Sequence, residues 1–149
     1  MAVDGKLRGR RTPGRPLWVA LAAALVVVVV LAFVIFAVLG PSPVKHDTNR
    51  WAVIQDLYAS RLAVEPTNDT VWARLVGMHG DGSRLWVGGV VERYANTWGF
   101  RFRPDTVRVA EITAEGLQST IRGISEDLDY WVGLGWAYVY AGVVEVHGS

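Results

Sequence analysis

The stretch that decides the organisation of this chain is Leu17–Leu39, LWVALAAALVVVVVLAFVIFAVL, an unbroken run of apolar residues. As a helix that rises about 1.5 Å per residue, such a run exceeds a hydrocarbon core about 30 Å thick. In lipid the backbone must satisfy its own hydrogen bonds, and a helix is the only single segment that does so. The sequence therefore predicts one transmembrane helix at 17–39.

The charges on either side of this run predict its direction. Residues 1–16 carry five Lys or Arg and one Asp, a net charge of +4, whereas residues 40–149 carry a net charge of −3. By the positive-inside rule, residues 1–16 form a basic cytoplasmic tail, and the remainder lies outside the cytoplasm. We therefore expect a single-pass protein of the cell membrane, in contact with the lipid bilayer.

A cleaved signal peptide is the alternative interpretation of a basic start followed by an apolar run. The run is longer than the roughly 7–15 residues of a typical signal-peptide core, and no clear A-x-A cleavage site follows it. Pro41 and Pro43 oppose helix continuation, so residues 40–48 are expected to be a short extended linker. An uncleaved signal-anchor is therefore favoured.

Beyond the linker, residues 49–149 are expected to form one extracytoplasmic α+β domain, in which two helices pack on one side of a small, mostly antiparallel sheet. The expected element order is α-β-β-β-β-α-β. Hydrophobic periodicity and turn residues predict helices at 49–63 and 119–131, strands at 71–78, 85–93, 99–103, 107–112 and 136–146, and a hairpin turn at 80–83. In the last strand, Trp136, Tyr138 and Tyr140 are expected on one face, opposite Ala137, Val139 and Ala141.

Composition excludes several classes of function. The chain has no cysteine, so it has no disulfide, thiolate metal ligand or cysteine nucleophile. The domain lacks the basic patch that a nucleic-acid-binding protein needs. The three histidines, His46, His79 and His147, are too widely spaced for a zinc motif. No cofactor is predicted and no catalytic constellation is present, so we expect the protein not to be an enzyme.

A few residues are candidates for binding. Glu126, Asp127 and Asp129 are weak candidates for a cation site, although a solvated helix face accounts for them more simply. Asn68 begins the triplet Asn68-Asp69-Thr70, an acceptor pattern for N-glycosylation. The domain also contains six tryptophans, most of them expected in the core. Trp51 and Trp98 are the two expected to be partly exposed and available for interaction.

Over about residues 85–136 the order of motifs resembles the amino-terminal domain family of the slime-mould calmodulin-binding protein. The resemblance is carried by Leu85-Trp86-Val87-Gly88-Gly89-Val90-Val91, by Trp98-Gly99-Phe100-Arg101-Phe102 with Pro104-Asp105-Thr106-Val107, by Val109-Ala110-Glu111, and by Glu126-Asp127-Leu128-Asp129-Tyr130-Trp131. The chain has Leu117 and Trp136 where members of that family carry cysteine, so no role of those cysteines is implied. The resemblance implies a fold and no reaction.

Two functions remain open from the sequence. The first is a membrane-anchored extracytoplasmic interaction module, an accessory subunit of a larger membrane or envelope complex whose partners are other membrane proteins. The alternative is an exported domain that binds a small ligand or a cation through the acidic helix 119–131 and the neighbouring loop. A stoichiometric complex favours the first, and a monomer stabilised by a ligand favours the second.

Overall fold

The computed structural model describes residues 17–39 and 45–148 of the 149-residue chain. It divides into two compact units at Pro43, and each is described by itself. The first contains helix α1 (Leu17–Leu39), at the position predicted from the sequence. The described side chains of α1 run from Val19 to Ala32, and over the described residues no helix is long and apolar enough to cross a membrane. The expected basic tail, residues 1–16, lies outside the described residues.

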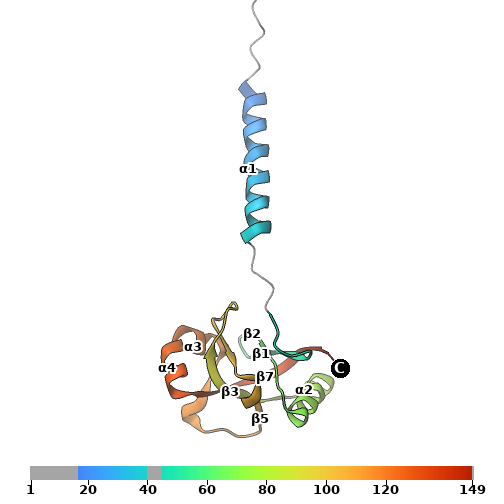
Figure 1. Cartoon of the computed structure of the whole chain (residues 1–149), viewed down its shortest axis with the longest axis vertical. Helices are drawn as coiled ribbons and strands as arrows, with labels where there is room; N and C mark the ends of the chain where they lie inside the picture. Colours follow the sequence, from blue (N-terminus) through green and yellow to red (C-terminus); the bar gives the residue numbers. More distant parts are fainter. Residues whose placement is uncertain (1–16, 40–44, 149) are drawn as a thin grey trace, which may run out of the picture. The chain divides into compact units, whose positions relative to one another are not determined.

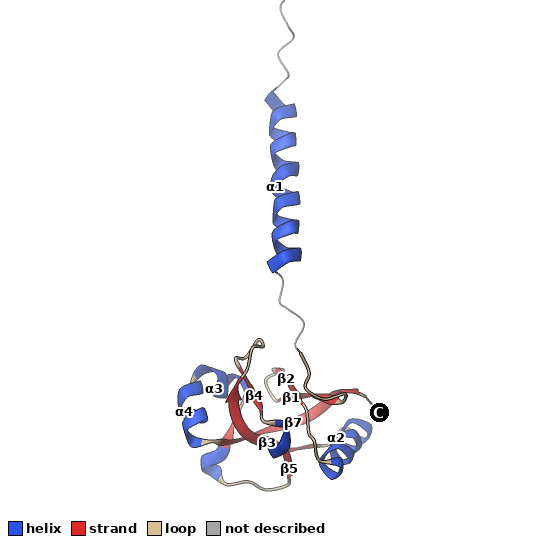
Figure 2. Ribbon diagram, in the orientation of Figure 1, coloured by secondary structure: helices blue, strands red, loops and turns tan. Residues whose placement is uncertain are grey.

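The second unit is an α+β domain with a mostly antiparallel sheet, as predicted (Figures 1 and 2). Its elements are β1 (Trp51–Asp56), β2 (Arg61–Val64), α2 (Asp69–Asp81), β3 (Arg84–Arg93), β4 (Phe100–Phe102), the 3-10 helix η1 (Pro104–Thr106), β5 (Arg108–Ala110), the 3-10 helix η2 (Glu115–Leu117), β6 (Gln118–Ser119), α3 (Ile121–Glu126), α4 (Leu128–Leu134) and β7 (Trp136–His147). The domain therefore has three α-helices where two were predicted.

The sheet is organised around β7. The strand order is β2-β1-β7-β3-β4, with β5 paired to β3 and with β6 paired to β7 as the one parallel pair among the described strands. The strands β1 and β3 meet only through β7, which pairs with both of them. Figure 2 shows the strands curving around one core, with α2 and the α3–α4 pair at different sides of the domain.

The core lies on one face of this sheet. Ala137, Val139 and Ala141 of β7 are fully buried, whereas the alternate residues of β7 are partly or well exposed, as the sequence predicts. All three helices contribute buried side chains to the same cluster: Leu75 and Met78 from α2, Ile121 and Ile124 from α3, and Trp131 from α4. Burying such side chains contributes about 1.5–3 kcal/mol each.

The predicted helix at 49–63 is wrong, because this segment forms the antiparallel hairpin β1–β2. Burial in β1 has a period of two, with Ala52, Ile54 and Asp56 buried and the intervening residues partly exposed. Leu57 and Tyr58, which suggested a helical spacing, lie in the turn with 65% and 76% of their surface exposed. Ala59 has a φ of 63°, which ends the first strand sharply.

The predicted strand at 71–78 and the hairpin turn at 80–83 are also wrong, because this segment is helix α2 and its end. The side chain of Asn68 caps the helix by accepting hydrogen bonds from the backbone N–H groups of Thr70 and Val71. At the other end Gly82 adopts the left-handed conformation, with a φ of 70°, and donates its N–H to the carbonyl of Met78. Of the two glycines that predicted a hairpin turn, Gly82 therefore terminates a helix and Gly80 lies within it.

The remaining predictions agree with the structure in outline. Strands at 85–93, 99–103 and 136–146 are confirmed as β3, β4 and β7, and the strand at 107–112 is shorter, as β5. The single helix predicted at 119–131 is two helices, α3 and α4, which meet at Asp127 in a non-helical conformation. Gly135, with a φ of 95°, ends α4, whereas Gly133 lies within it.

Candidate functional site

The outward side of β3 and β7 carries a cluster of aromatic side chains. In the register of the two strands Trp86 lies opposite Tyr140, and their rings are 5.3 Å apart at 57°. Trp136 and Tyr138 follow along β7, with stacked rings 6.1 Å apart. We call these four residues the aromatic face. Each is partly or well exposed, and Tyr140 has 37% of its surface exposed.

Glycine flattens this surface. Gly88 lies opposite Tyr138, and a Cβ atom at Gly88 would be 2.6 Å from the Tyr138 ring. The ring therefore rests directly on the backbone of β3, which no other residue would permit. Gly142 lies opposite Arg84 in the same way, and a Cβ there would be 3.4 Å from the Arg84 side chain. The aromatic face therefore lies close to the backbone of the sheet, with the side chain of Arg84 at its border.

Two arginines border the aromatic face. Arg84 lies on the same side of β3 as Trp86, two residues away, and Arg108 of β5 is paired with Gly88. Both guanidinium groups bond only backbone oxygens, Arg84 to Gln55 at 3.3 Å and Arg108 to Val107 at 3.0 Å. Among the described residues neither has a carboxylate within salt-bridge distance.

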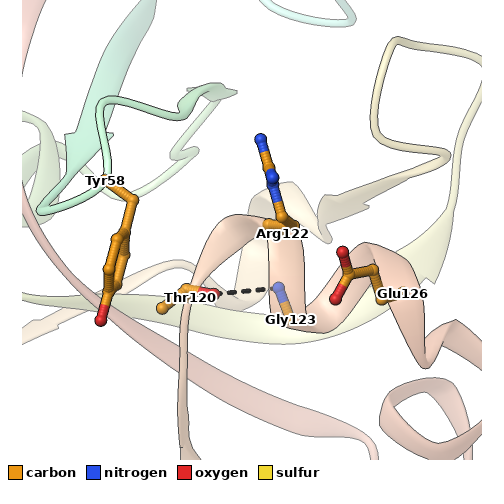
Figure 3. Close-up of a pocket in the computed structure, with 5 residues that line it drawn as sticks. All are labelled: Tyr58, Thr120, Arg122, Gly123 and Glu126. Carbon is orange, nitrogen blue, oxygen red and sulfur yellow. Dashed lines mark hydrogen bonds between the residues drawn. The ribbon is translucent and has the colours of Figure 1, made fainter.

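A pocket of about 440 Å³ lies between the β1–β2 turn and α3. Figure 3 shows Arg122 and Glu126 projecting from α3, and Tyr58 of the turn lying across from Thr120. Thr120 and Gly123 complete the lining, and the Thr120 hydroxyl accepts a hydrogen bond from the Gly123 N–H at 2.9 Å. The pocket therefore presents one positive charge, one negative charge and an aromatic ring to a ligand.

The wall of this pocket is fixed by a buried carboxylate. Asp56, at the end of β1, is 2% exposed and accepts hydrogen bonds from the N–H groups of Tyr58, Ser60 and Ile121. The first two bonds shape the β1–β2 turn, and the third joins that turn to the start of α3. Asp56 therefore holds the two sides of the pocket together, 65 residues apart in sequence.

The segment 45–50 is attached to the body of the domain through a second buried carboxylate, Glu65. Glu65 accepts hydrogen bonds from the N–H groups of Asp47 at 2.7 Å and Thr48 at 3.2 Å, and the His46 ring lies 3.0 Å from it. Arg101 pairs with Asp47, and the hydrogen bond and positive charge of Arg101 lower the pKa of the Asp47 carboxyl.

Trp51 is part of this attachment. Its ring stacks between His46, with centroids 3.9 Å apart, and His147, with centroids 4.8 Å apart. Trp98 is held by a hydrogen bond from its Nε1 to the carbonyl of Arg61 and borders a smaller pocket of about 110 Å³. Both tryptophans are partly exposed, as predicted, and their role in interaction stays a prediction.

The three acidic candidates do not converge. Glu126 lines the pocket, Asp127 precedes α4 at the N-cap position without a side-chain hydrogen bond to the helix, and Asp129 pairs with Arg93. In the described ranges no group of three or more His, Cys, Asp or Glu side chains is placed to hold a metal ion. Asn68 uses its side-chain oxygen to cap α2, and its glycosylation stays a prediction.

The sequence reasoning missed the aromatic face as a surface. The alternation in 136–146 placed Trp136, Tyr138 and Tyr140 together, but most tryptophans were expected in the core. Instead Trp131 is the buried one of the six, and the other five are partly exposed. Gly88, within the apolar run of β3, was the available signal, because a glycine inside a strand often marks a close approach of another group.

The chain was also compared with known proteins. The resemblance to the slime-mould domain family stays a prediction. Known protein families, curated proteins and solved structures contain no match to this chain.

Proposed function

We propose that this protein is a membrane-anchored extracytoplasmic interaction module, an accessory subunit of a larger membrane complex. The run at 17–39 would be its anchor, with the N-terminus in the cytoplasm, as the flanking charges favour. The proposal involves no reaction catalysed by the domain.

The aromatic face is the observation that carries this proposal. The helix side chains that are buried in the core pack with the opposite face of β7, and Trp86, Trp136, Tyr138 and Tyr140 remain partly or well exposed. Aromatic residues and arginine are enriched in protein interfaces, and a contiguous exposed apolar patch often marks a binding site. A platform of four aromatic side chains bordered by arginines fits a protein partner.

The test is the native mass of the full chain after extraction from its membrane in mild detergent. We expect a particle larger than the monomer with fixed stoichiometry. Replacing Trp86 and Tyr140 together by alanine should release the chain as a monomer, because aromatic anchors carry much of the binding energy of an interface. A particle of monomer mass for the unmodified chain would contradict the proposal.

The control is Tyr130→Ala. Tyr130 is a well exposed tyrosine, with 54% of its surface accessible, but it lies on α4 rather than on the aromatic face. This variant should keep the particle intact. Thermal melting of each variant separates loss of binding from loss of folding.

The pocket favours a second candidate function, an exported ligand-binding domain. Its volume of about 440 Å³ is that of a small-molecule site, and Glu126 belongs to the acidic helix from which this alternative was inferred. The charges of Arg122 and Glu126 suit a small zwitterion. If this function holds, free α-amino acids should raise the melting temperature of the monomer, and Arg122→Ala should abolish the rise.

A further inference from the structure

We propose that the aromatic face binds an extended acidic segment of a partner protein, whose carboxylates pair with Arg84 and Arg108. This inference rests on the proposed interaction function and adds the chemistry of the partner.

The pairing of the arginines supports this choice. Six of the nine described arginines have a carboxylate partner within the domain: Arg50, Arg61, Arg74, Arg93, Arg101 and Arg103. The other three are Arg84, Arg108 and Arg122. Arg122 lines the pocket, so every described arginine without a carboxylate borders one of the two candidate sites. Guanidinium groups bind carboxylates with two parallel hydrogen bonds, and the groups of Arg84 and Arg108 border this face without a carboxylate partner in the described domain.

The spacing of the two arginines defines the shape of the segment. Residues 84 and 88 are separated by about 13 Å along β3, at roughly 3.3 Å per residue, and β5 lies about 4.8 Å to the side. The Arg84 guanidinium bonds the carbonyl of Gln55 in β1, so it reaches across β7, whereas Arg108 lies on β5 beside Gly88. Three strand spacings of about 4.8 Å and the length of about 13 Å along β3 together give a diagonal of about 20 Å. An extended peptide that crosses the sheet covers this diagonal with carboxylates about six residues apart.

The surface between the arginines suits an apolar side chain. Trp86 and Tyr140 lie there with tilted rings, and the ring of Tyr138 rests on Gly88 just beyond. A segment that follows this diagonal across the sheet would place an apolar residue on these rings while its flanking carboxylates reach Arg84 and Arg108. The partner therefore combines acidic and apolar residues.

Photo-crosslinking from position 140 tests this proposal. The full chain, in its native membrane, carries benzoyl-phenylalanine in place of Tyr140, and the cross-linked peptide is identified by mass spectrometry. We expect a peptide of another protein with two Asp or Glu residues about six positions apart. Raising the ionic strength should lower the yield, because salt screens pairs of exposed charges.

A charge-reversal variant gives the specific readout. Arg84→Glu with Arg108→Glu should lower the cross-link yield by about tenfold or more, because like charges then face each other. The matched control is Arg74→Glu with Arg93→Glu, which changes the net charge equally at two exposed arginines that pair with Glu111 and with Asp129 of α4. The control should retain the yield. If the double glutamate variant has a lower melting temperature than the unmodified chain, Arg84→Gln with Arg108→Gln is used in its place.

The outcomes separate the inference from the function it rests on. A large particle whose cross-link survives the double reversal, or whose cross-linked peptide lacks acidic residues, overturns the inference and leaves the interaction function standing. A cross-link to lipid or to a second copy of this chain also overturns it. A chain of monomer mass with no protein cross-link overturns both.

Discussion

Asp56 is the single residue on which most of the local geometry depends. Its buried carboxylate accepts three backbone N–H groups from two separate segments. Asp56→Ala leaves these donors without their acceptor, and the bonds from Ser60 and Ile121 are buried, so it should lower the free energy of unfolding by about 2–4 kcal/mol. Denaturant unfolding followed by circular dichroism measures the change.

Asp105→Ala is the matched control for that prediction. Asp105 bonds the side chain of Arg103 rather than buried backbone N–H groups and is 65% exposed, so the variant should change the free energy of unfolding by less than about 1 kcal/mol. Equal losses for the two aspartates would show that the three bonds of Asp56 do not stabilise the domain.

Asp47 gives a prediction that depends on pH. Arg101 holds its pKa below the ordinary value, so the ionised carboxylate stabilises the folded state. This contribution is fully present above the unfolded pKa of aspartate and is lost as the pH falls through the lower folded pKa. Arg101→Met should raise the Asp47 pKa towards its ordinary value, which an NMR titration of the side-chain carbonyl measures.

Asp81 is the internal reference for this titration. Hydrogen bonds from Ser83, and no arginine, lower its pKa. The Arg101→Met variant should therefore leave the titration of Asp81 unchanged. A shift of both aspartates together would mean that the variant disturbs the fold.

The sequence predicted the exposure of some single residues but not the buried hydrogen bonds of others. Trp51 and Trp98 were correctly expected to be partly exposed, because one follows the linker and the other lies in a loop. The buried carboxylates of Asp56 and Glu65 were not found, because their partners lie up to 65 residues away and leave no local pattern. Long-range hydrogen bonds of this kind depend on the tertiary fold.

Among the elements, the pair β3–β7 depends on the glycine under Tyr138. A Cβ at Gly88 would lie 2.1 Å from the carbonyl oxygen of Ala137, which is backbone and has little room to move. Gly88→Ala should therefore lower the free energy of unfolding by about 1–3 kcal/mol or more. Thermal or denaturant unfolding measures the loss.

Gly77→Ala is the opposite case in helix α2. A Cβ at Gly77 meets nothing within 4 Å, and the residue is in the interior of a helix. Alanine loses less backbone entropy there, so this variant should raise the free energy of unfolding by about 0.5–1 kcal/mol. A destabilised Gly77→Ala would contradict the helical assignment of 69–81.

In the first half of the domain the sequence predicted a helix where the structure has the hairpin β1–β2, and a strand where it has the helix α2. Val71 and Trp72 favour strands by intrinsic preference, but a capping asparagine and the buried pair Leu75 and Met78 determine a helix. Conversely, Leu57 and Tyr58 are spaced as in a helix relative to their apolar neighbours, but they lie exposed in the β1–β2 turn. Strand β7 was predicted correctly because its alternation extends over a long segment.

For the molecule as a whole, residues 44–149 should fold without the N-terminal unit. Every buried hydrophobic residue described lies between Ala52 and Val143, and all of them form one cluster. A protein of these residues should therefore unfold in a single cooperative transition, with coincident curves from circular dichroism and tryptophan fluorescence. Separate transitions would mean that α2 or the α3–α4 pair is stable by itself.

The α+β class and the mostly antiparallel sheet were predictable because apolar residues recur with a strand-like spacing in some segments and a helix-like spacing in others. The strand order and the two candidate sites were not, because they depend on which strands become neighbours. The anchor at 17–39 stays a prediction from hydrophobicity and flanking charge.

The central place of β7 has a consequence for the biogenesis of this domain. The β1–β2 hairpin and the β3–β4 pair share no backbone pairing with each other, and β7 at 136–147 is the strand that pairs with β1 and with β3. A ribosome delivers these residues after all the other strands, so the pairing of the sheet is completed only once they have emerged. Until then the two strand pairs lack the strand that joins them.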